Sequence, residues 1–434
     1  MKNLITKKVA VIGAGFVGLA HSIFLADEYS QVILFDRNEE VIKNLKNGKV
    51  TILTEDESLI KKASSGIKNG VLMPTADISD IDGSSIIFVA IGLDFFASTN
   101  GYANLESLCS KLSLYIKSDT LLVMESTLPP GTIDKFVIPS IINENENINK
   151  KNLNLVYAYE RVMPGPEYMS SLKSLPKVFG ALNESSQKLY EEHLNISMPE
   201  LEHRCLPNIA SAELSKVVEN SYRMANIALV SEFSDFASKI GADLVGILEA
   251  IRMRPTHSNI RYAGQAPGGY CLTKDPEFLF ESSSVQGFEI NMNIIGSAID
   301  KTKKMNKIVE EFVRSHIDVS ENCAFLGISY RSGVGDLRES SALELAISLN
   351  KQGYNLEIFD PYVDQNELVN SLEFINVNEI SKTQAILAVK HAGFDLDFLS
   401  KFKLLIDINS CLTVAERSRL RKKGIKIKQF GDFS

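Results

Sequence analysis

The chain has 434 residues, of which 44% are hydrophobic and 23% are charged, a composition typical of a folded soluble protein and unlike that of a disordered chain. The length predicts two or three domains rather than one core. A formal net charge of -8 excludes a whole-chain basic field that would attract nucleic acid. No stretch approaches the roughly 20 apolar residues of a membrane span, and we expect no signal peptide and no membrane partner.

The cysteines are five in number and far apart in the sequence: Cys109, Cys205, Cys271, Cys323 and Cys411. They form no Cys-x-x-Cys pair, and the six histidines form no ligand cluster along the chain, so we expect no metal site. An odd, scattered set is typical of reduced thiols, which predicts a cytoplasmic protein.

The first part of the chain alternates short apolar runs with helical patterns. We expect strands at residues 9–12, 31–35, 86–90, 121–124 and 153–157. This alternation predicts right-handed βαβ units and a doubly wound parallel sheet.

The middle and the end of the chain differ in pattern. Apolar residues at helical spacing predict one long helix over 209–239 and further helices over 243–253 and 290–313, whereas strands at 324–328 and 355–360 flank a helix at 340–350. The strand ending at Asp360 echoes the one ending at Asp36, so we interpret the two α/β segments as a repeat. The predicted fold is α/β, with two Rossmann-like doubly wound domains joined by a helical domain. The predicted boundaries are 1–205, 206–316 and 317–434.

A glycine-rich turn follows the first predicted strand and opens a helix. Its cofactor-binding residues are Gly13, Gly15, Phe16, Val17 and Gly18. Three glycines at this spacing permit a tight turn, close approach of a pyrophosphate and close helix–strand packing. Asp36 ends the next strand, where a carboxylate accepts hydrogen bonds from a ribose diol and repels a 2′-phosphate. The turn therefore predicts NAD rather than NADP, with Arg37 adjacent.

Four further segments carry candidate chemistry. Residues 125–132 read Glu-Ser-Thr-Leu-Pro-Pro-Gly-Thr and follow an apolar strand, at the sheet edge where ligands bind. Glu160 and Arg161 follow another strand, and Lys216 and Asn220 lie four residues apart on the long helix. The fourth segment, 266–276, reads Ala-Pro-Gly-Gly-Tyr-Cys-Leu-Thr-Lys-Asp-Pro. Glycines there would let the backbone approach a ligand, beside a thiol that can act as a nucleophile.

These motifs, in this order, resemble the UDP-glucose/GDP-mannose dehydrogenase family over nearly the whole chain. The stretch 327–340, Gly-Ile-Ser-Tyr-Arg-Ser-Gly-Val-Gly-Asp-Leu-Arg-Glu-Ser, is similar to the family's third motif. The resemblance implies a four-electron oxidation, in which NAD takes two hydrides from C6 of a nucleotide sugar to make a uronic acid. It also implies a UDP-sugar substrate, precursor synthesis for surface polysaccharide, and a homodimer or higher homo-oligomer joined through the helical domain.

The resemblance assigns a role to each candidate residue. Cys271 would capture the aldehyde as a thiohemiacetal and carry the later thioester. Lys216 and Asn220 would stabilise the developing oxyanion, and Glu160 would activate the hydrolytic water. Asp275 would relay a proton or hold Lys216, and Thr127 would hold a water. Ser126 and Thr127 would also contact the cofactor. The expected substrate-binding residues are Glu160, Arg161, Lys216, Asn220, Arg261, Gly268, Gly269 and Arg338.

The choice of sugar is open in the sequence. Glu160-Arg-Val-Met-Pro-Gly is similar to members that act on UDP-N-acetylhexosamines, whereas Gly-Tyr-Cys-Leu is closer to the UDP-glucose branch. We expect a UDP-N-acetylhexosamine, ManNAc or GlcNAc, with UDP-glucose as the alternative. Arg252, Arg254 and Arg261 are all candidates for the arginine that contacts the sugar. Residues 91–96 depart from the family's usual turn, which affects the expected cofactor contacts of that loop.

Two other functions fit parts of the sequence. A two-electron dehydrogenase of the 3-hydroxyacid type also combines a Rossmann domain with helices, but needs neither Cys271 nor a second α/β domain. A nucleotide-sugar or NAD sensor on a degenerate scaffold would explain the altered loop, but not the retained catalytic set.

Overall fold

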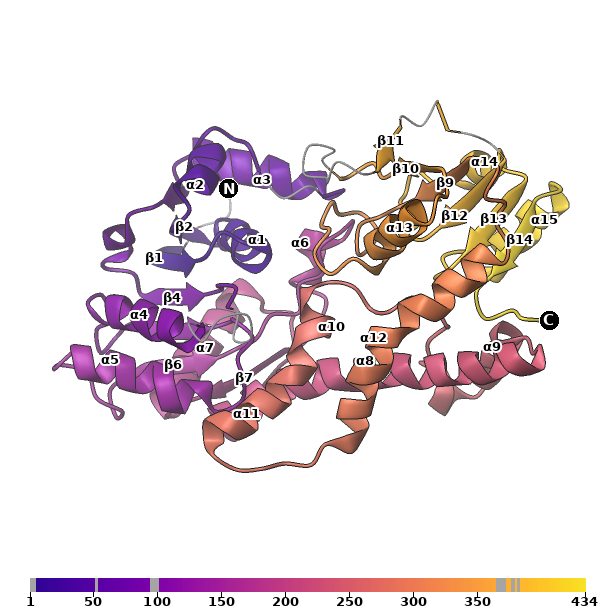
Figure 1. Cartoon of the computed structure of the whole chain (residues 1–434). Helices are drawn as coiled ribbons and strands as arrows, with labels where there is room; N and C mark the ends of the chain where they lie inside the picture. The colour runs from indigo at the N-terminus through magenta and orange to yellow at the C-terminus, as the bar shows by residue number, and fades with distance from the viewer. Residues whose placement is uncertain (1–4, 51–53, 94–100, 364–371, 376–378, 381–382) are drawn as a thin grey trace. The chain divides into compact units, whose positions relative to one another are not determined.

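The computed structural model describes residues 5–50, 54–93, 101–363, 372–375, 379–380 and 383–434 (Figure 1). The chain divides into two compact units. The first consists of Met1–Ile52, Asp56–Val218 and Phe278–Ile290, and the second of Leu53–Glu55, Glu219–Glu277 and Asn291–Ser434. The predicted boundaries of three domains stay a prediction.

The first unit is built on an eight-stranded sheet. Its strands are β1 (Ile5–Ile12), β2 (Tyr29–Phe35), β3 (Leu72–Thr75), β4 (Ile86–Val89), β5 (Leu121–Met124), β6 (Asn154–Tyr157), β7 (Lys177–Ala181) and β8 (His203–Leu206). They lie in the order β3-β2-β1-β4-β5-β6-β7-β8, with β6 and β7 antiparallel and the other neighbours parallel. The order of the first six is that of a dinucleotide-binding fold.

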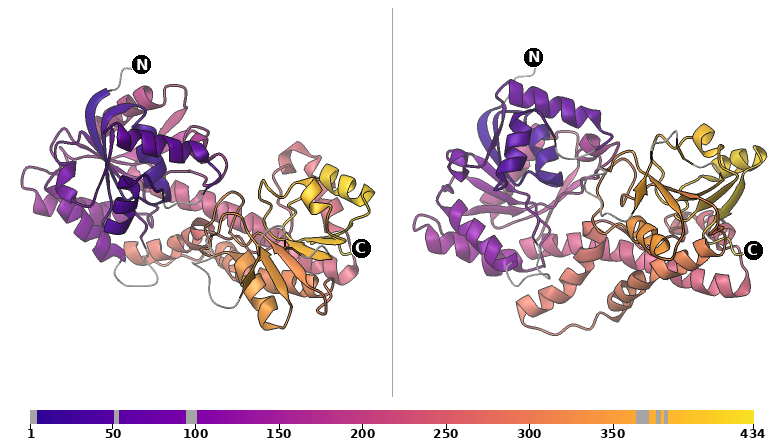
Figure 2. Two further views of the ribbon diagram at one scale, coloured as in Figure 1. Left: turned by 90° about the horizontal axis from the view of Figure 1, so that it is seen from above. Right: turned by 45° about the horizontal axis from the view of Figure 1, so that its top comes forward.

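Both faces of this sheet are covered by helices. Alternate residues of a strand point to opposite faces, so each strand contributes to two core clusters. Val9 and Val11 of β1 join one core cluster, whereas Ala10 and Ile12 join the other. Figure 2 shows helices on both sides of the sheet. The first cluster includes residues of α1 (Phe16–Leu25), α2 (Glu39–Lys46), α3 (Glu57–Lys68), α6 (Tyr168–Ser171) and α7 (Glu184–Ser197). The second includes residues of α4 (Gly101–Ser113), α5 (Ile138–Glu144) and α11 (Phe278–Gln286).

The second unit repeats this architecture. Its strands are β9 (Cys323–Leu326), β10 (Leu356–Phe359), β11 (Glu373–Phe374), β12 (Gln384–Leu387), β13 (Leu404–Asp407) and β14 (Lys426–Gln429). They are all parallel, in the order β11-β10-β9-β12-β13-β14. Numbered within the unit, this is again the order 3-2-1-4-5-6. The covering helices are α13 (Ser341–Lys351), α14 (Leu396–Leu399) and α15 (Val414–Lys422).

The predicted repeat extends to one shared contact. Asp36, after β2, accepts a hydrogen bond from the backbone N–H of Ala14 in the turn after β1 (2.7 Å). Asp360, after β10, accepts two from Ile328 and Ser329 in the turn after β9 (2.8 and 3.0 Å). In each unit, therefore, a carboxylate at the end of the second strand ties down the turn after the first.

The predicted long helix is confirmed as α8 (Ile209–Ile240), which has 32 residues. Its first ten residues belong to the first unit and the rest to the second. The expected helices that follow are α9 (Leu244–Arg252) and α12 (Asn293–Arg314). In this middle part of the chain the helices α10 (Tyr270–Lys274) and α11 were not predicted, because the glycines and prolines around them indicate irregular structure.

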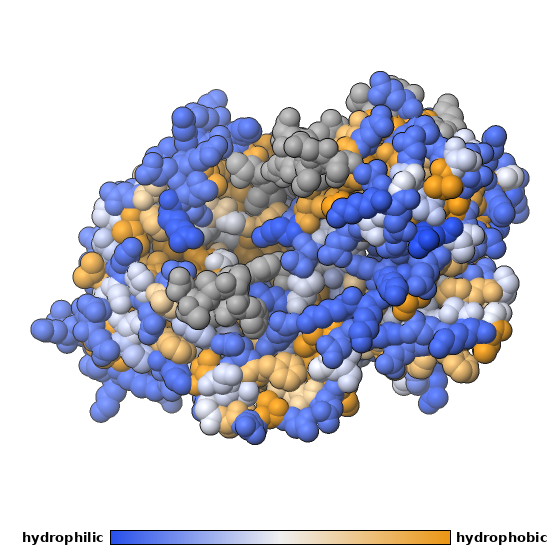
Figure 3. Space-filling model, viewed as in Figure 1, coloured by the Kyte–Doolittle hydropathy of each residue, from blue (hydrophilic) through white to orange (hydrophobic). Residues whose placement is uncertain are grey.

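Hydrophilic side chains cover most of the face seen in Figure 3, with smaller apolar areas among them. Within the described ranges, no helix is both long enough and apolar enough to cross a membrane.

Candidate active site

The three glycines of the first turn have different surroundings. Gly13 has φ +104°, a value that L side chains rarely adopt, and a Cβ on Gly18 would lie 1.9 Å from the carbonyl oxygen of Gly13. These two glycines are required by the turn and by helix packing. A Cβ on Gly15, in contrast, would meet no atom within 4 Å. The exposed Gly15 therefore leaves open space at the start of α1, where backbone N–H groups favour an anion.

The remaining cofactor-binding candidates lie around this turn. Phe16 and Val17 are half-buried in the first turn of α1, and Arg37 is exposed beside Asp36. Asp36 accepts hydrogen bonds from the N–H groups of Ala14 and Asn38. This contact aligns the carboxylate with the glycine turn, as a ribose diol requires. The open space at Gly15 and the acid after β2 together fit NAD.

Residues 125–132 start at the end of β5, as expected. Ser126 is buried, and its hydroxyl accepts a hydrogen bond from the N–H of Ile91 and donates one to the Ile91 carbonyl, both at 2.9 Å. It therefore ties the residues after β4 to those after β5. Thr127 is half-buried next to it. In the altered loop Leu93 is buried, whereas residues 94–96 lie outside the described part of the chain.

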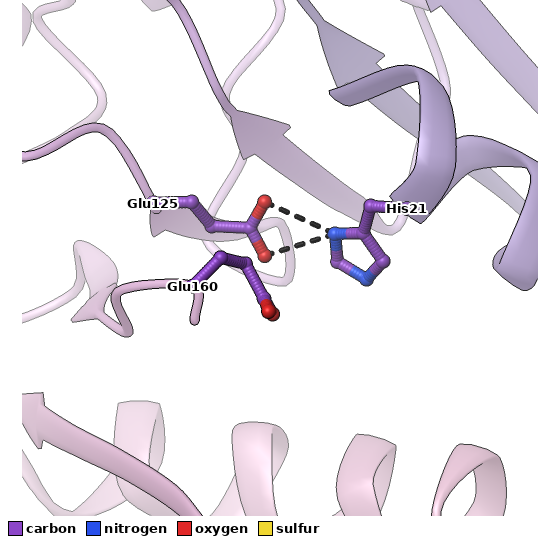
Figure 4. A group of neighbouring side chains, drawn as sticks. All are labelled: His21, Glu125 and Glu160. Atoms are coloured by element: carbon purple, nitrogen blue, oxygen red, sulfur yellow. Dashed lines mark hydrogen bonds and ion pairs between the residues drawn. The ribbon is translucent and has the colours of Figure 1, made fainter. Parts of the chain in front are cut away.

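A buried charged cluster lies at this end of the sheet (Figure 4). Nδ1 of His21, on α1, lies 2.9 and 3.0 Å from the two carboxylate oxygens of Glu125. Glu160 lies beside them, and its Oε1 pairs with the ammonium group of Lys177 on β7. Burial raises the pKa of Glu125, and the bond from His21 opposes that effect. Sequence reasoning did not foresee this cluster, because the fold brings together His21 and Glu125, which are 104 positions apart in the chain.

The cluster has the ligand spacing of a metal site. One ligand atom each from His21, Glu125 and Glu160 lies within 4.8 Å of the others. Nδ1 of His21 already bonds to Glu125, and Lys177 places a positive charge on Glu160, whereas Nε2 of His21 is buried with no hydrogen-bond partner among the described residues. This arrangement supplies the positive charge that a metal ion would otherwise bring.

Lys216 lies in the same unit, on the first part of α8. Its side chain is buried, and its Nζ donates a hydrogen bond to the backbone carbonyl of Glu160 at 3.2 Å and lies 5.5 Å from the centre of the Tyr159 ring. Arg161 donates to the Tyr159 hydroxyl and to the carbonyl of Pro176. The predicted neighbours Glu160, Arg161 and Lys216 thus lie together in the first unit.

The second unit holds the thiol and the rest of the predicted set. Cys271 is exposed in α10, and Asp275 follows one turn later. Asp275 is buried, and its Oδ2 accepts a hydrogen bond from Nδ2 of Asn220 at 2.6 Å. This bond attaches the cysteine-bearing turn to α8.

The other thiols have different environments. All five cysteines are described, and none is in a disulfide. Burial raises the pKa of Cys109 and Cys323 to about 12, and it also raises that of Cys205 and Cys411. These four thiols are poor sources of thiolate, which leaves exposed Cys271 as the candidate nucleophile.

The glycine pair before Cys271 serves packing within the unit. A Cβ on Gly269, which has φ +85°, would lie 2.7 Å from the Tyr330 ring, and one on Gly268 would lie 2.8 Å from the Glu339 carbonyl oxygen. The N–H of Gly269 also donates to that carbonyl at 3.3 Å. Tyr330 and Glu339 thus occupy the space on the side-chain faces of these glycines, and the predicted role of Gly268 and Gly269 in substrate binding stays a prediction. They anchor the thiol-bearing turn against the loop after β9.

The arginine candidates separate in the structure. Arg252 donates to the Ile260 carbonyl and stacks on Tyr262 at 4.1 Å, whereas Arg254 and Arg261 are exposed. The positive charges of Arg261 and of Arg331 act on Arg223, whose pKa is lowered by burial and then by both of them. Clustered guanidinium groups of this kind favour an anionic ligand. Arg338 forms an ion pair with Asp336, to which both its Nε and its Nη2 donate hydrogen bonds.

Comparison with known proteins agrees with this geometry. The NAD binding domain of the UDP-glucose/GDP-mannose dehydrogenase family matches residues 7–195, its central domain matches 210–307, and its UDP binding domain matches 324–414. The chain belongs to this family. It is an NAD-dependent oxidoreductase with an α/β fold, as the sequence predicted.

Individual relatives are distant but match over the full length. UDP-N-acetyl-D-mannosamine dehydrogenase from Methanocaldococcus jannaschii is 28% identical, covering 99% of this chain and 98% of the relative. The structure of UDP-N-acetyl-mannosamine dehydrogenase Cap5O from Staphylococcus aureus is 22% identical with a TM-score of 0.80, covering 98% of both chains. A UDP-glucose dehydrogenase from Pyrobaculum islandicum is 18% identical with a TM-score of 0.81, covering 100% and 99%. These two structures confirm the fold.

Some residues of this family member were missed by sequence reasoning. No sequence motif links the members of the buried cluster, because they come from separate parts of the chain: His21 from α1, Glu125 from the end of β5 and Lys177 from β7. Glu213, within the Ala-Glu motif of α8, is fully buried and accepts hydrogen bonds from the N–H groups of Gly131 and Ile133. Sequence reasoning could have found Glu213, because it is an acidic residue within the family motif on this helix.

Proposed function

We propose that this protein oxidises C6 of a UDP-N-acetylhexosamine to the carboxylate, with two NAD consumed per sugar. The exposed thiol of Cys271 carries this proposal, because it differs from the four buried or partly buried cysteines in the same chain. Bound NAD supplies the hydride acceptor, and the Gly13–Gly18 turn and Asp36 are the residues that would hold it.

The chain's own residues divide the remaining work. The C6 hydroxyl loses a proton and a hydride to become an aldehyde, and the Cys271 sulfur then bonds to the aldehyde carbon. Loss of a second hydride converts this adduct to a thioester, so the intermediate cannot diffuse away half-oxidised. Lys216 and Asn220 supply a charged and a neutral donor for the developing oxyanion. Water, activated by Glu160, breaks the C–S bond and releases the carboxylate.

Support for a nucleotide sugar comes from the second unit. Its parallel sheet is a complete α/β unit, for which a two-electron 3-hydroxyacid dehydrogenase has no use. The Arg223, Arg261 and Arg331 cluster supplies positive charge for a diphosphate. Arg261 is the first candidate for the sugar contact, because its charge acts within this cluster, whereas Arg252 is bonded to Ile260. Arg338 would reach the nucleotide after releasing Asp336.

A UDP-N-acetylhexosamine is the substrate that we expect first. Several relatives matched over nearly the full chain are named UDP-N-acetyl-D-mannosamine dehydrogenase. UDP-glucose is the alternative, since the Pyrobaculum islandicum protein that shares this fold is named as a UDP-glucose dehydrogenase. A cytoplasmic location, consistent with five free thiols, is part of the proposal.

A substrate panel tests the proposal directly. The protein is incubated with NAD and UDP-ManNAc, UDP-GlcNAc, UDP-GalNAc, UDP-glucose or GDP-mannose, and NADH and sugar product are counted. We expect two NADH per uronic acid, with an N-acetylhexosamine as the best substrate. One NADH per sugar would indicate the two-electron rival, preference for UDP-glucose would transfer the assignment to that sugar, and tight binding without turnover would indicate a sensor.

We also propose a homodimer joined through α8. This helix exposes an apolar stripe at helical spacing, consisting of Tyr222, Leu229, Phe233, Phe236 and Ile240. Each is at least 44% exposed, an unusual concentration for one helix of a monomer. A second copy packing on this stripe would bury it.

A further inference from the structure

A lysine outside every motif faces the proposed hydrolytic base. The ammonium group of Lys177 pairs with Oε1 of Glu160, and the two residues are 7% and 8% exposed. We propose that Lys177 is a positioning residue that holds Glu160 as a carboxylate, ready to accept the proton of the water that attacks the thioester. The proposal rests on the proposed four-electron reaction.

Two neighbouring strands of the first sheet bring these side chains together. β6 and β7 are antiparallel, with Val156 opposite Ala181 and Tyr157 opposite Gly180. Lys177 is the first residue of β7, and Glu160 follows the end of β6 by three residues, so both lie where the chain leaves β6 beside the start of β7. Both side chains are buried, so the contact lies in the protein interior and does not depend on a flexible surface rotamer.

The other groups around Glu160 do not replace this cation. Glu125, after β5, is a second carboxyl, and its bond is to His21 of α1 (Figure 4). From α7, burial raises the pKa of Tyr190 and lowers that of His193 to about 3, which keeps both neutral. Lys216, from α8, donates to the backbone carbonyl of Glu160.

Electrostatics then define what Lys177 does. Burial favours the neutral form of a carboxyl group, and a neighbouring carboxylate favours it further. A neutral Glu160 could not accept a proton. Lys177 supplies the opposing charge at contact distance. In the step itself, the water oxygen bonds to the thioester carbon, its proton passes to Glu160, and the C–S bond breaks with its electron pair on sulfur. No electron is gained or lost, so neither an oxidant nor a reductant is needed.

The test separates hydride transfer from hydrolysis. Lys177→Met is mixed rapidly with NAD and UDP-ManNAc, and NADH release and the acyl adduct on Cys271 are followed by absorbance and by mass spectrometry of quenched protein. We expect two NADH per subunit in a burst, accumulation of the thioester, and steady-state turnover lower by on the order of 10–100-fold. The low-pH limb of turnover should move to higher pH, and Lys177→Arg should restore most of the rate.

Matched controls address folding and charge. Lys173→Met removes a lysine whose side chain is 54% exposed and should leave burst and turnover unchanged. Because the proposed effect of Lys177 on hydrolysis is exerted through Glu160, the double variant Glu160→Gln/Lys177→Met, which removes both charges of the pair, should hydrolyse at the same rate as Glu160→Gln. This comparison decides the question even where Lys177→Met alone folds poorly.

The outcomes distinguish this inference from the proposed function. A wild-type protein that yields one NADH per sugar overturns the four-electron reaction. A wild-type protein that yields two, together with a Lys177→Met protein of unchanged turnover and pH profile, overturns the role of Lys177 alone. A further tenfold loss in the double variant would likewise show that Lys177 acts elsewhere.

Discussion

Glycines at the residue scale show how one residue type meets different demands. Gly13 and Gly18 are required by the protein's own backbone, whereas Gly15 leaves space that no protein atom fills. The sequence pattern indicated all three together, whereas the structure separates the two glycines that packing requires from the one that leaves open space.

Gly15→Ala should therefore affect binding and not folding. Its backbone φ of -77° suits alanine, so we expect an unchanged melting temperature. The methyl group would hold the pyrophosphate off the helix N-terminus, weakening NAD binding by about 1–3 kcal/mol through lost charge-assisted hydrogen bonds. Calorimetric titration with NAD measures this. Gly393→Ala, also in open space, is the control, and equal affinity in both variants would contradict the assignment.

Cys271→Ser tests the thiol. We expect uronic acid formation to fall by on the order of 100-fold, or about 3 kcal/mol of transition-state stabilisation, because a hydroxyl is a weaker nucleophile and forms no thioester. NAD affinity should not change. Cys205→Ser, at a partly buried thiol that donates to Leu206, should retain activity. Undiminished acid production by Cys271→Ser would refute the covalent route.

At the element scale, α10 depends on the residue before it. Gly269 combines a positive φ with close contact to Tyr330, while Gly287 has φ +76° and no neighbour within 4 Å. Gly287→Ala should cost about 1–2 kcal/mol for the strained backbone. Gly269→Ala should cost about 1–3 kcal/mol more for overpacking and should also displace Cys271, reducing turnover. Urea unfolding and kinetics measure both effects, and equal losses would show that the contact with Tyr330 is unimportant.

Glu213 links α8 to the segment before α5, and its burial predicts a pH dependence. Burial raises the pKa of Glu213 to about 7 from its ordinary value of 4.5, although the N–H groups of Gly131 and Ile133 oppose the shift. The folded state then holds this proton more tightly than the unfolded state. The protonated Glu213 therefore stabilises the folded state below about pH 4.5. This stabilisation, on the order of 3 kcal/mol, is lost as the pH rises through about 7.

Glu213→Gln removes this titration. The melting temperature of the variant should fall less than that of the wild type between about pH 5 and pH 7.5. Glu40→Gln, at an exposed position on α2, should follow the wild type. Parallel curves for Glu213→Gln and wild type would show that the buried carboxyl does not govern this dependence.

At the scale of the whole molecule, the apolar stripe of α8 predicts self-association. Phe236 is 66% exposed, and an aspartate there would place a charge in the proposed interface. Phe236→Asp should weaken the dimer by about 2 kcal/mol or more and favour the 48.0 kDa monomer in sedimentation. Leu114→Asp, at an exposed leucine of the first unit, is the control. A wild-type protein that is monomeric at micromolar concentration would exclude this interface.

The sequence by itself determined the two α/β units, the long helix and the NAD turn, and it predicted the candidate site residues from Thr127 to Arg338. These features depend on local periodicity and on short motifs, which can be identified without knowing which distant residues are in contact. Three matters depended on tertiary structure: the His21–Glu125–Glu160–Lys177 cluster, the packing task of Gly268 and Gly269, and the partner of Asn220. Each requires residues far apart in the chain to meet, and strand register and helix packing decide such meetings.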